Sequence, residues 1–318
     1  MSSPTRPICP CPPELRAEAL EVLYRKVPAS LRPTLVAGAL AEAEAGRVDL
    51  SGLWIVRRRG KLLGALLTQP LAGRAAAVWA PEVAQAWGRS ATAAALIRQA
   101  LDDLRARGFK IAQALVDASS ARTASADLAR GGLPAITALT YLHRETARPI
   151  GPSPGYPEPP PFAWRAYDEA TEADFREVLR ATYAGSLDMP ELEGIRSLDD
   201  VMASHRAAGR FDPSRWRVGH LPGEPEAAAI LLLSEVPDRP AWEVAYLGLT
   251  PAARGRGLGR SALAHALDLA RPEVPRVELA VDDRNHPARK LYDLAGFAPF
   301  DRRTVHLAIL NPPSTPGP

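Results

Sequence analysis

The chain has 318 residues, of which 46% are hydrophobic, and this is enough for the packed cores of about two domains of ~150 residues. The formal net charge is only +3, and although 39 Lys and Arg residues bring the pI to about 9.0, no basic run is long enough to indicate a nucleic-acid-binding protein. No apolar run reaches the ~18 residues of a membrane span, and the N-terminal stretch lacks the apolar core of a secretory signal.

Residues 1–13 are rich in proline and are expected to be a disordered tail. They contain both cysteines of the chain, Cys9 and Cys11. A C-P-C pair can bind a metal ion, but there is no third cysteine and no His-rich segment nearby, so we expect no metal. The low cysteine content predicts a cytoplasmic protein without disulfides.

The first half, 14–148, alternates segments of helical and strand periodicity. The expected helices are 14–27, 31–46, 90–108 and 118–132. The expected strands are a hairpin over 53–69 that turns at Arg59 and Gly60, followed by 75–81, 110–117 and 138–144.

Residues 149–161 contain seven prolines in thirteen residues and predict a stiff, extended linker between two domains, because proline fixes φ and removes a hydrogen-bond donor. The end of the chain, 311–318, is expected to be a second disordered tail.

The second half, 162–310, repeats the element order of the first. The expected strands are 162–167, 216–221, 227–236, 242–249, 276–282 and 302–310. The expected helices are 171–185, with Thr171 and Asp174 as a capping box, 197–209, capped by Ser197, 258–270 and 286–297. We therefore expect an α/β (α+β) fold of two tandem domains, each a mixed, mainly antiparallel sheet flanked by helices.

Residues 249–260 read LTPAARGRGLGR and connect an expected strand to an expected helix. Glycines at this density let a backbone approach a ligand closely, and the free N–H groups at a helix N-terminus favour an anion, most often a phosphate. The alternative is a tight turn with surface arginines, and the loop alone does not decide between the two.

Two linked motifs in the second half resemble the GNAT superfamily of N-acetyltransferases. The first is the phosphate loop, which here reads Arg254-Gly255-Arg256-Gly257-Leu258-Gly259 after Leu249-Thr250-Pro251. The second is the helix motif formed by Asn285, Ala288, Leu291, Tyr292, Gly296 and Phe297. The resemblance covers 162–310 by motif and 14–145 by element order alone.

The resemblance implies transfer of an acetyl group from acetyl-CoA to an amine. The pyrophosphate would lie on the loop N–H groups with three arginines nearby, and pantetheine would pair with the strand end. Asn285 would either cap its helix or contact the cofactor. The implied acetyl-CoA contacts are Leu247, Gly248, Leu249, Arg254, Gly255, Arg256, Gly257, Leu258, Gly259, Arg260 and Asn285.

For catalysis, Tyr292 is expected to protonate the leaving thiolate, and packing in the core is the alternative for its ring. Glu243, on the strand before the loop, is the expected general base, with Glu235 and His220 in reserve. Strict alternation would put Glu243 on the opposite face from Tyr246. No cysteine lies in this half, which favours direct attack of the amine over an acyl-cysteine intermediate.

In the first half the equivalent loop retains one glycine, Gly88, and one arginine, Arg89, and the position of Tyr292 falls at Asp127 or Leu128. We expect a degenerate domain with a structural role, and a weak or altered acyl-CoA site is the alternative. The tandem layout is similar to that of mycothiol synthases, a resemblance of architecture that does not extend to the acceptor.

The acceptor site is expected near the acidic loop 186–197, which carries Asp188, Glu191 and Glu193. A small-molecule amine is the expected acceptor, and a protein or peptide is the alternative; neither nucleic acid nor membrane is an expected partner. The rival function is a non-catalytic acyl-CoA-binding or sensor protein.

Overall fold

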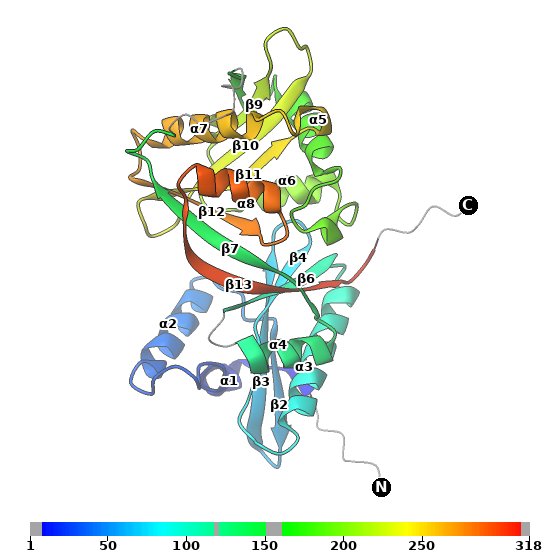
Figure 1. The fold of residues 1–318 in the computed structure, drawn as a ribbon. Coiled ribbons are helices and arrows are strands. Elements are labelled where there is room, and N and C mark those ends of the chain that lie inside the picture. Colours follow the sequence, from blue (N-terminus) through cyan, green and yellow to red (C-terminus); the bar gives the residue numbers. More distant parts are fainter. Residues whose placement is uncertain (1–7, 118–120, 151–160, 313–318) are drawn as a thin grey trace, which may run out of the picture. The chain divides into compact units, whose positions relative to one another are not determined.

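The computed structural model describes residues 8–117, 121–150 and 161–312 (Figure 1). Its contacts divide the chain into a first unit, Met1–Ile136 with Arg303–Pro318, and a second unit, Thr137–Arg302. Each unit is an α/β structure built on a mixed, mainly antiparallel sheet, so the expected fold class is confirmed.

The sheet of the second unit has the strand order β7-β12-β11-β10-β9-β8, in which only β11 and β12 run parallel. Its strands are β7 (Ala135–Glu145), β8 (Ala163–Ala166), β9 (Trp216–His220), β10 (Ala227–Glu235), β11 (Ala241–Leu249) and β12 (Arg276–Asp282).

Helices cover both faces of this sheet because β10 is apolar on both sides. Ile230 and Leu232 pack under α5 (Glu172–Tyr183) and α6 (Leu198–Arg206). Leu231 and Leu233, which alternate with them, pack under α7 (Leu258–Ala270) and α8 (His286–Leu294). Alternating side chains along one buried strand thus place α5 and α6 opposite α7 and α8.

The first unit repeats this architecture with the strand order β1-β2-β3-β4-β6-β13, in which only β4 and β6 run parallel. Its strands are β1 (Ile8–Pro10), β2 (Leu53–Arg58), β3 (Lys61–Leu71), β4 (Ala75–Val78), β5 (Glu82–Val83, paired with β3), β6 (Ile111–Asp117) and β13 (Ala298–Ile309). Its helices are α1 (Arg16–Leu23), α2 (Arg32–Glu44), α3 (Arg89–Ala106) and α4 (Ala121–Gly131). The first two contribute to one core and the last two to another.

The division into units differs from the expected boundary at the proline-rich segment. Strand β7 pairs with β12, and most of β13 pairs with β6, so each half of the sequence supplies a strand to the other unit. Side-chain complementarity supports the first pairing, since Glu145 lies opposite Arg276 and accepts a hydrogen bond from it at 3.2 Å. Of the expected linker, residues 151–160 lie outside the described residues.

The expected N-terminal tail is partly ordered. Ile8–Pro10 form β1 against β2, and Cys11 is buried, which raises the pKa of its thiol to about 11. Of the second expected tail, Asn311 donates to the Phe109 carbonyl at 2.8 Å. Residues 1–7 and 313–318 lie outside the described residues. Within 8–117, 121–150 and 161–312, no three His, Cys, Asp or Glu side chains are arranged as a metal site.

One of the two expected caps is correct. Ser197 and Asp200 form a reciprocal capping box at the start of α6. Thr171 precedes α5, but its hydroxyl is engaged with Ala166 and Asp168 and makes no cap. The Thr171 hydroxyl stabilises the turn before α5 instead of forming a capping box with Asp174, and the residue spacing does not reveal this turn.

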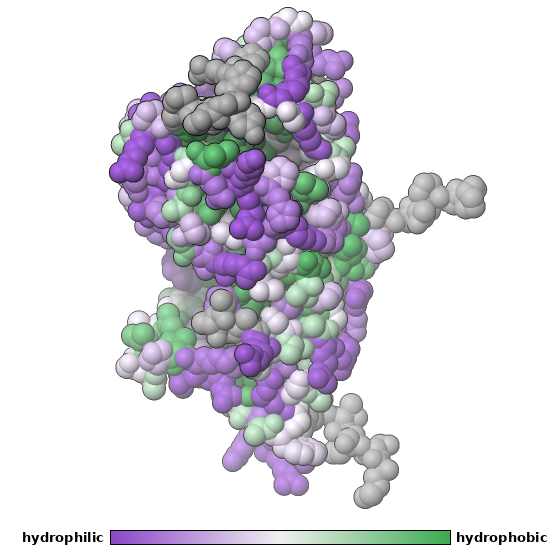
Figure 2. Space-filling model, viewed as in Figure 1, coloured by the Kyte–Doolittle hydropathy of each residue, from purple (hydrophilic) through white to green (hydrophobic). Residues whose placement is uncertain are grey.

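Hydrophilic residues cover most of the face seen in Figure 2, with hydrophobic ones in scattered groups. In the parts of the chain that the structure describes, no helix has both the length and the apolar character needed to cross a membrane.

Candidate functional site

A β-bulge in β11 determines which side chains face the candidate site. Leu232 lies opposite Tyr246 and Leu233 opposite Val244, so Ala245 is an extra residue in β11. The bulge shifts Tyr246 toward α5 and α6, while Val244 packs on the α7 side. The strict alternation that we expected is therefore wrong beyond Ala245.

Strands β11 and β12 separate just before the bulge. Their parallel pairing ends at Glu243 and Glu278, while β11 stays paired with β10 as far as Leu249. In the described part of the chain, the segment from Leu247 to Leu249 therefore has no ladder partner on its β12 side. The Leu249 carbonyl accepts from Arg254 Nε at 3.2 Å, and the other backbone groups on that side are available to a ligand.

The glycine loop turns sharply into α7. Gly255 and Gly257 have φ of +74° and +77°, values that L side chains rarely adopt, and a Cβ added to either would meet no protein atom within 4 Å. Gly257 is the N-cap of α7. Among the described residues, no protein acceptor binds the N–H groups of Gly255, Gly257, Leu258 or Gly259. The loop thus presents unpaired donors to open space at a helix N-terminus, an arrangement that fits a phosphate.

These donors border a cavity of about 470 Å³, which we call the loop cavity. Its walls include the end of β11, the glycine loop, and the inner side of α8. The expected contacts that line it are Leu247, Gly248, Leu249, Arg254, Gly255, Gly257, Leu258, Gly259, Arg260 and Asn285, together with Tyr292. Apolar walls ending in a donor-rich loop fit a thioester chain with a pyrophosphate at one end.

Two of the three loop arginines have structural partners. The Arg254 guanidinium donates to the carbonyl groups of Thr182 and Ala184, at 2.8 Å each, and so closes the C-terminal end of α5. Arg256 pairs with Glu224 at 3.0 Å and is not among the residues that line the loop cavity. The Arg254 guanidinium, which we expected near a phosphate, is therefore directed at backbone carbonyls. Arg260 is the other loop arginine that lines the loop cavity.

Tyr292 projects from α8 into the wall of the loop cavity and packs against Phe297, with 5.8 Å between ring centroids. Burial, and then the nearby charge of Asp188, raise the pKa of its hydroxyl. The phenol is therefore protonated at neutral pH and can act as a proton donor. Asn285 caps α8 by accepting from the Ala288 N–H at 3.2 Å, which favours the first of its two expected roles.

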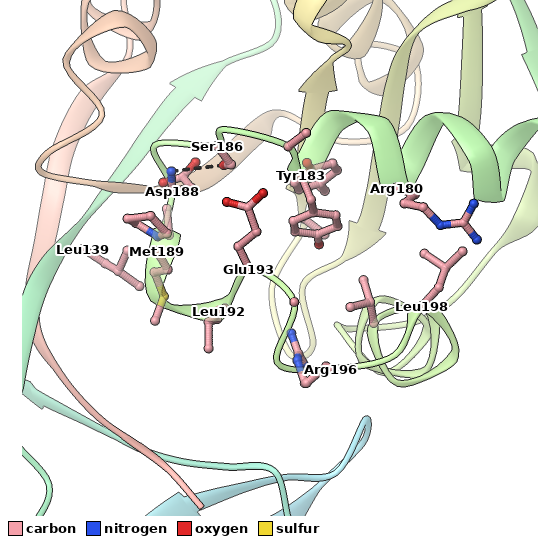
Figure 3. Close-up of a pocket in the computed structure, with 17 residues that line it drawn as sticks. Leu139, Arg180, Tyr183, Ser186, Asp188, Met189, Leu192, Glu193, Arg196 and Leu198 are labelled. Atoms are coloured by element: carbon pink, nitrogen blue, oxygen red, sulfur yellow. Dashed lines mark hydrogen bonds between the residues drawn. The ribbon is translucent and has the colours of Figure 1, made fainter. Parts of the chain in front are cut away.

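A second cavity of about 580 Å³, which we call the loop-186 cavity, lies between α5, α6 and the acidic loop (Figure 3). One wall is the stacked pair Tyr183 and Tyr246, with 5.2 Å between centroids. Its charged lining residues are Arg180, Asp188, Glu193 and Arg196. The two cavities share three lining residues, Ser186, Asp188 and Tyr246, and so adjoin each other.

The acidic loop is fastened to the end of β12 by a charged network. Arg284 makes a bidentate pair with Glu191, at 2.6 and 3.0 Å, and donates to the buried Asp282 at 2.8 Å. Asp188 accepts from the Asp282 N–H and, at 3.2 Å, from Asn285. The charge of Glu191 is thus neutralised, and Asp188 is positioned where the two cavities meet.

The expected general bases lie away from this junction. Glu243 lines neither cavity; burial, and then the neighbouring Glu278, raise the pKa of its carboxyl. Glu235 pairs with Arg215 at 3.1 Å, and His220 lies on β9, outside both linings. Asp188, which the sequence placed only in an acidic loop, is the carboxylate at the junction; its contact with β12 connects residues 94 positions apart and leaves no local signal.

In the first unit, the arginine of the equivalent loop forms an ion pair with a buried carboxylate. Gly88 is the N-cap of α3 with φ of +66°, as Gly257 is of α7, but Arg89 forms an ion pair with the buried Asp127 at 2.7 Å. Ser90 donates to the same carboxylate at 2.9 Å. A carboxylate at Asp127, one of the two positions expected for the tyrosine, thus neutralises the arginine of the loop.

Comparisons with known proteins agree with this geometry. Residues 187–297 match the model of the acetyltransferase (GNAT) family. A mycothiol acetyltransferase of Beutenbergia cavernae is 38% identical over 130 residues, covering 41% of this chain and 43% of that protein. A mycothiol acetyltransferase of Thermomonospora curvata is 34% identical over 140 residues, 42% of this chain and 43% of that protein. Each match thus spans less than half of the relative's length. A GCN5-related N-acetyltransferase from Sphaerobacter thermophilus has a TM-score of 0.61 at 17% identity, over 98% of both chains, and so shares the fold.

Proposed function

We propose that the second unit, in which residues 187–297 match the acetyltransferase (GNAT) family model, transfers the acetyl group of acetyl-CoA to the amine of a small molecule by direct attack. The observation that carries the proposal is the meeting of the two cavities at Ser186, Asp188 and Tyr246. A donor in the loop cavity and an acceptor in the loop-186 cavity would be neighbours there, which is what a transfer without a covalent enzyme intermediate requires.

The loop cavity is the proposed donor site. Bound there, acetyl-CoA supplies an activated thioester carbonyl. The N–H groups of Gly257, Leu258 and Gly259 would bind its pyrophosphate with the α7 dipole behind them. The unpaired edge of β11 around Gly248 would bind the pantetheine amides. Arg260 would add positive charge, and Arg254 would support the site by fastening the end of α5 to β11.

Two protons must move in this reaction. The Tyr292 hydroxyl is the proposed donor to the departing thiolate, supported by its place in the wall of the loop cavity. For the amine proton, Asp188 is the proposed acceptor, since it lines both cavities and burial raises the pKa of its carboxyl toward that of a useful base. Glu243 is the alternative and would have to act through water.

The acceptor is proposed only as a small-molecule amine. The relatives named mycothiol acetyltransferases support a small acceptor. Each of the two matches covers only 43% of the relative, so the acceptor of those proteins is not assigned to this chain. A volume of about 580 Å³ suits a small molecule. We place the reaction in the cytoplasm, in keeping with the low cysteine content.

The test is an initial-rate assay of the purified chain with acetyl-CoA and a panel of primary amines. Release of free CoA thiol, together with an acetylated amine detected by mass spectrometry, is the expected result, and the reaction without amine is the control. A non-catalytic acyl-CoA-binding protein would bind acetyl-CoA in calorimetry and release no thiol with any amine. A protein acceptor would require acetylated peptides and an inactive small-molecule panel.

A further inference from the structure

Arg196 lines the loop-186 cavity as a cation without an ion-pair partner among the described residues. Its Nη1 donates to the Ser204 hydroxyl at 2.6 Å, and its Nε is buried with no hydrogen-bond partner among the described residues. No carboxylate in the described part of the chain forms an ion pair with it. Burial is also the main cause that lowers the pKa of its guanidinium.

The groups around Arg196 compensate its charge only in part. The Asp200 carboxylate raises the pKa of the guanidinium, but burial outweighs it, and Asp200 is hydrogen-bonded in the capping box with Ser197. His205 hydrogen-bonds to the Tyr183 hydroxyl, and burial lowers the pKa of its imidazole to about 4, so it is neutral. A partly buried cation with an unused donor is costly unless an anion completes the site. The remaining lining arginine, Arg180, adds positive charge to the same cavity.

The opposite end of the cavity is acidic. Figure 3 shows the Glu193 carboxylate directed toward Asp188 and Ser186, with Arg196 on the other side of Glu193. Glu193 has no ion-pair partner among the residues that the structure describes. Asp188 also lines the loop cavity, so the acidic end of the loop-186 cavity is the end next to the proposed acetyl-CoA site.

We propose that the acceptor is an amine that also carries a carboxylate, with its amine at Asp188 and Glu193 and its carboxylate on Arg196. One partly buried guanidinium matches one negative charge and can bind a carboxylate through a charge-assisted hydrogen bond. The apolar and aromatic wall between the two ends, with Tyr183, Tyr246 and Leu192, would contact the body of the molecule. The amine of the acceptor is inferred from the proposed acetyl transfer, on which this inference rests, and its carboxylate is inferred from the residues that line the cavity.

The test compares amines in matched pairs that differ only in the carboxylate: glycine, β-alanine, γ-aminobutyrate and ε-aminocaproate, each against its own amide. Both equilibrium binding by calorimetry and initial rates with acetyl-CoA are measured on the wild-type chain, on Arg196→Gln and on Arg196→Lys. Arg276→Gln, which removes an exposed arginine of β12 paired with Glu145 of β7, is the control variant.

At least one acid is expected to bind about tenfold or more tightly than its amide, the usual size of one charge-assisted interaction. Arg196→Gln should abolish that preference without weakening the amides, and Arg196→Lys should restore part of it. If Arg196→Gln unfolds the chain, the Arg196→Lys variant provides the test. The ratio of its affinity for the acid to its affinity for the amide should lie between the wild-type ratio and one.

The inference is overturned if the acids and amides bind equally to the wild-type chain, or if Arg196→Gln weakens both series alike. Failure of the proposed function has a different signature: acids would bind in preference to amides, in an Arg196-dependent way, while no thiol is released from acetyl-CoA. That result would support the anion site and reject acetyl transfer.

Discussion

The Asp188 carboxylate accepts a hydrogen bond from the backbone N–H of Asp282 at 2.9 Å, which joins the acidic loop to the end of β12. The contact brings a carboxylate from a surface loop to the junction of the two cavities. Besides burial, Asp282, Asn285 and Arg284 act on the pKa of the Asp188 carboxyl. The charge of Asp188 in turn raises the pKa of the phenols of Tyr183, Tyr246 and Tyr292.

The first prediction distinguishes Asp188 from Glu243 as the proton acceptor. Asp188→Asn should lower kcat by about 10²-fold, because a lost general base typically costs that much. A base must be ionised to act, and burial raises the pKa of Asp188, so wild-type kcat/KM should fall as the pH drops through a value above that of an ordinary aspartate. The measurement is a pH–rate profile.

Glu243→Gln is the matched variant, because burial also raises the pKa of that carboxyl. If Asp188 is the base, the acidic limb of the profile disappears in Asp188→Asn and persists in Glu243→Gln. The reverse pattern would assign the role to Glu243 and leave Asp188 as a residue that positions the loop.

The second prediction concerns the stability of the charged network. Arg284→Gln should destabilise the second unit by about 2 kcal/mol at neutral pH, since it leaves the fully buried Asp282 without its guanidinium partner. Hydrogen bonds from Arg284 lower the pKa of Glu191. Burial raises the pKa of Asp282, but hydrogen bonds from Arg284, Thr137 and Met189 together outweigh it and lower that pKa. A carboxyl whose pKa is lower in the folded than in the unfolded chain stabilises the fold at pH values above its unfolded-state pKa. This stabilisation is lost as the pH falls through its folded-state pKa.

Thermal melts of Arg284→Gln between neutral pH and pH ~3 provide the measurement. The difference from wild type should shrink toward acid pH. Arg302→Gln, which removes an exposed pair with Asp283, is the control and should change stability by no more than ~0.5 kcal/mol. Equal losses in the two variants would show that the network does not stabilise the loop.

Much of the fold was predictable, and the residues of the proposed donor site could be named, because their signals are local. Periodicity predicted β12 and α7 with their observed bounds, and the glycine loop leads directly into α7. The exchange of β7 and β13, the bulge at Ala245 and the Asp188–Asp282 contact depend on pairing between distant segments, and a single sequence carries no record of such pairing. Arg254 and Arg256 were expected to bind a phosphate because they lie in the glycine loop. Their observed partners, the Thr182 carbonyl and the Glu224 carboxylate, belong to segments distant in the sequence.

The third prediction tests the glycine loop against its degenerate counterpart. Gly257→Ala and Gly88→Ala both place a side chain at positive φ at a helix N-cap, and each should cost about 1–2 kcal/mol of stability. Only Gly257→Ala should weaken acetyl-CoA binding, by tenfold or more, because its Cβ would enter the open space in front of the loop donors. Calorimetric titration with acetyl-CoA measures the affinity of each. Equal affinities for the two variants would refute the phosphate site.

The central claim is that Tyr292 protonates the thiolate that leaves acetyl-CoA in the loop cavity. Tyr292→Phe retains the ring and its packing against Phe297 and removes only the proton donor, so the fold and the affinity for acetyl-CoA should be unchanged. Tyr167→Phe, which loses its hydrogen bond from Arg206 outside both cavities, is the control and should retain wild-type turnover.

The decisive measurement is the single-turnover rate of CoA thiol release by Tyr292→Phe at saturating acetyl-CoA and amine, with the Kd for acetyl-CoA determined in parallel. The account predicts a rate lower by about 10²-fold with an unchanged Kd. A rate equal to that of the wild type would contradict it and leave Tyr292 as a packing residue, and a loss of acetyl-CoA binding would show that the hydroxyl binds the donor instead of protonating the leaving group.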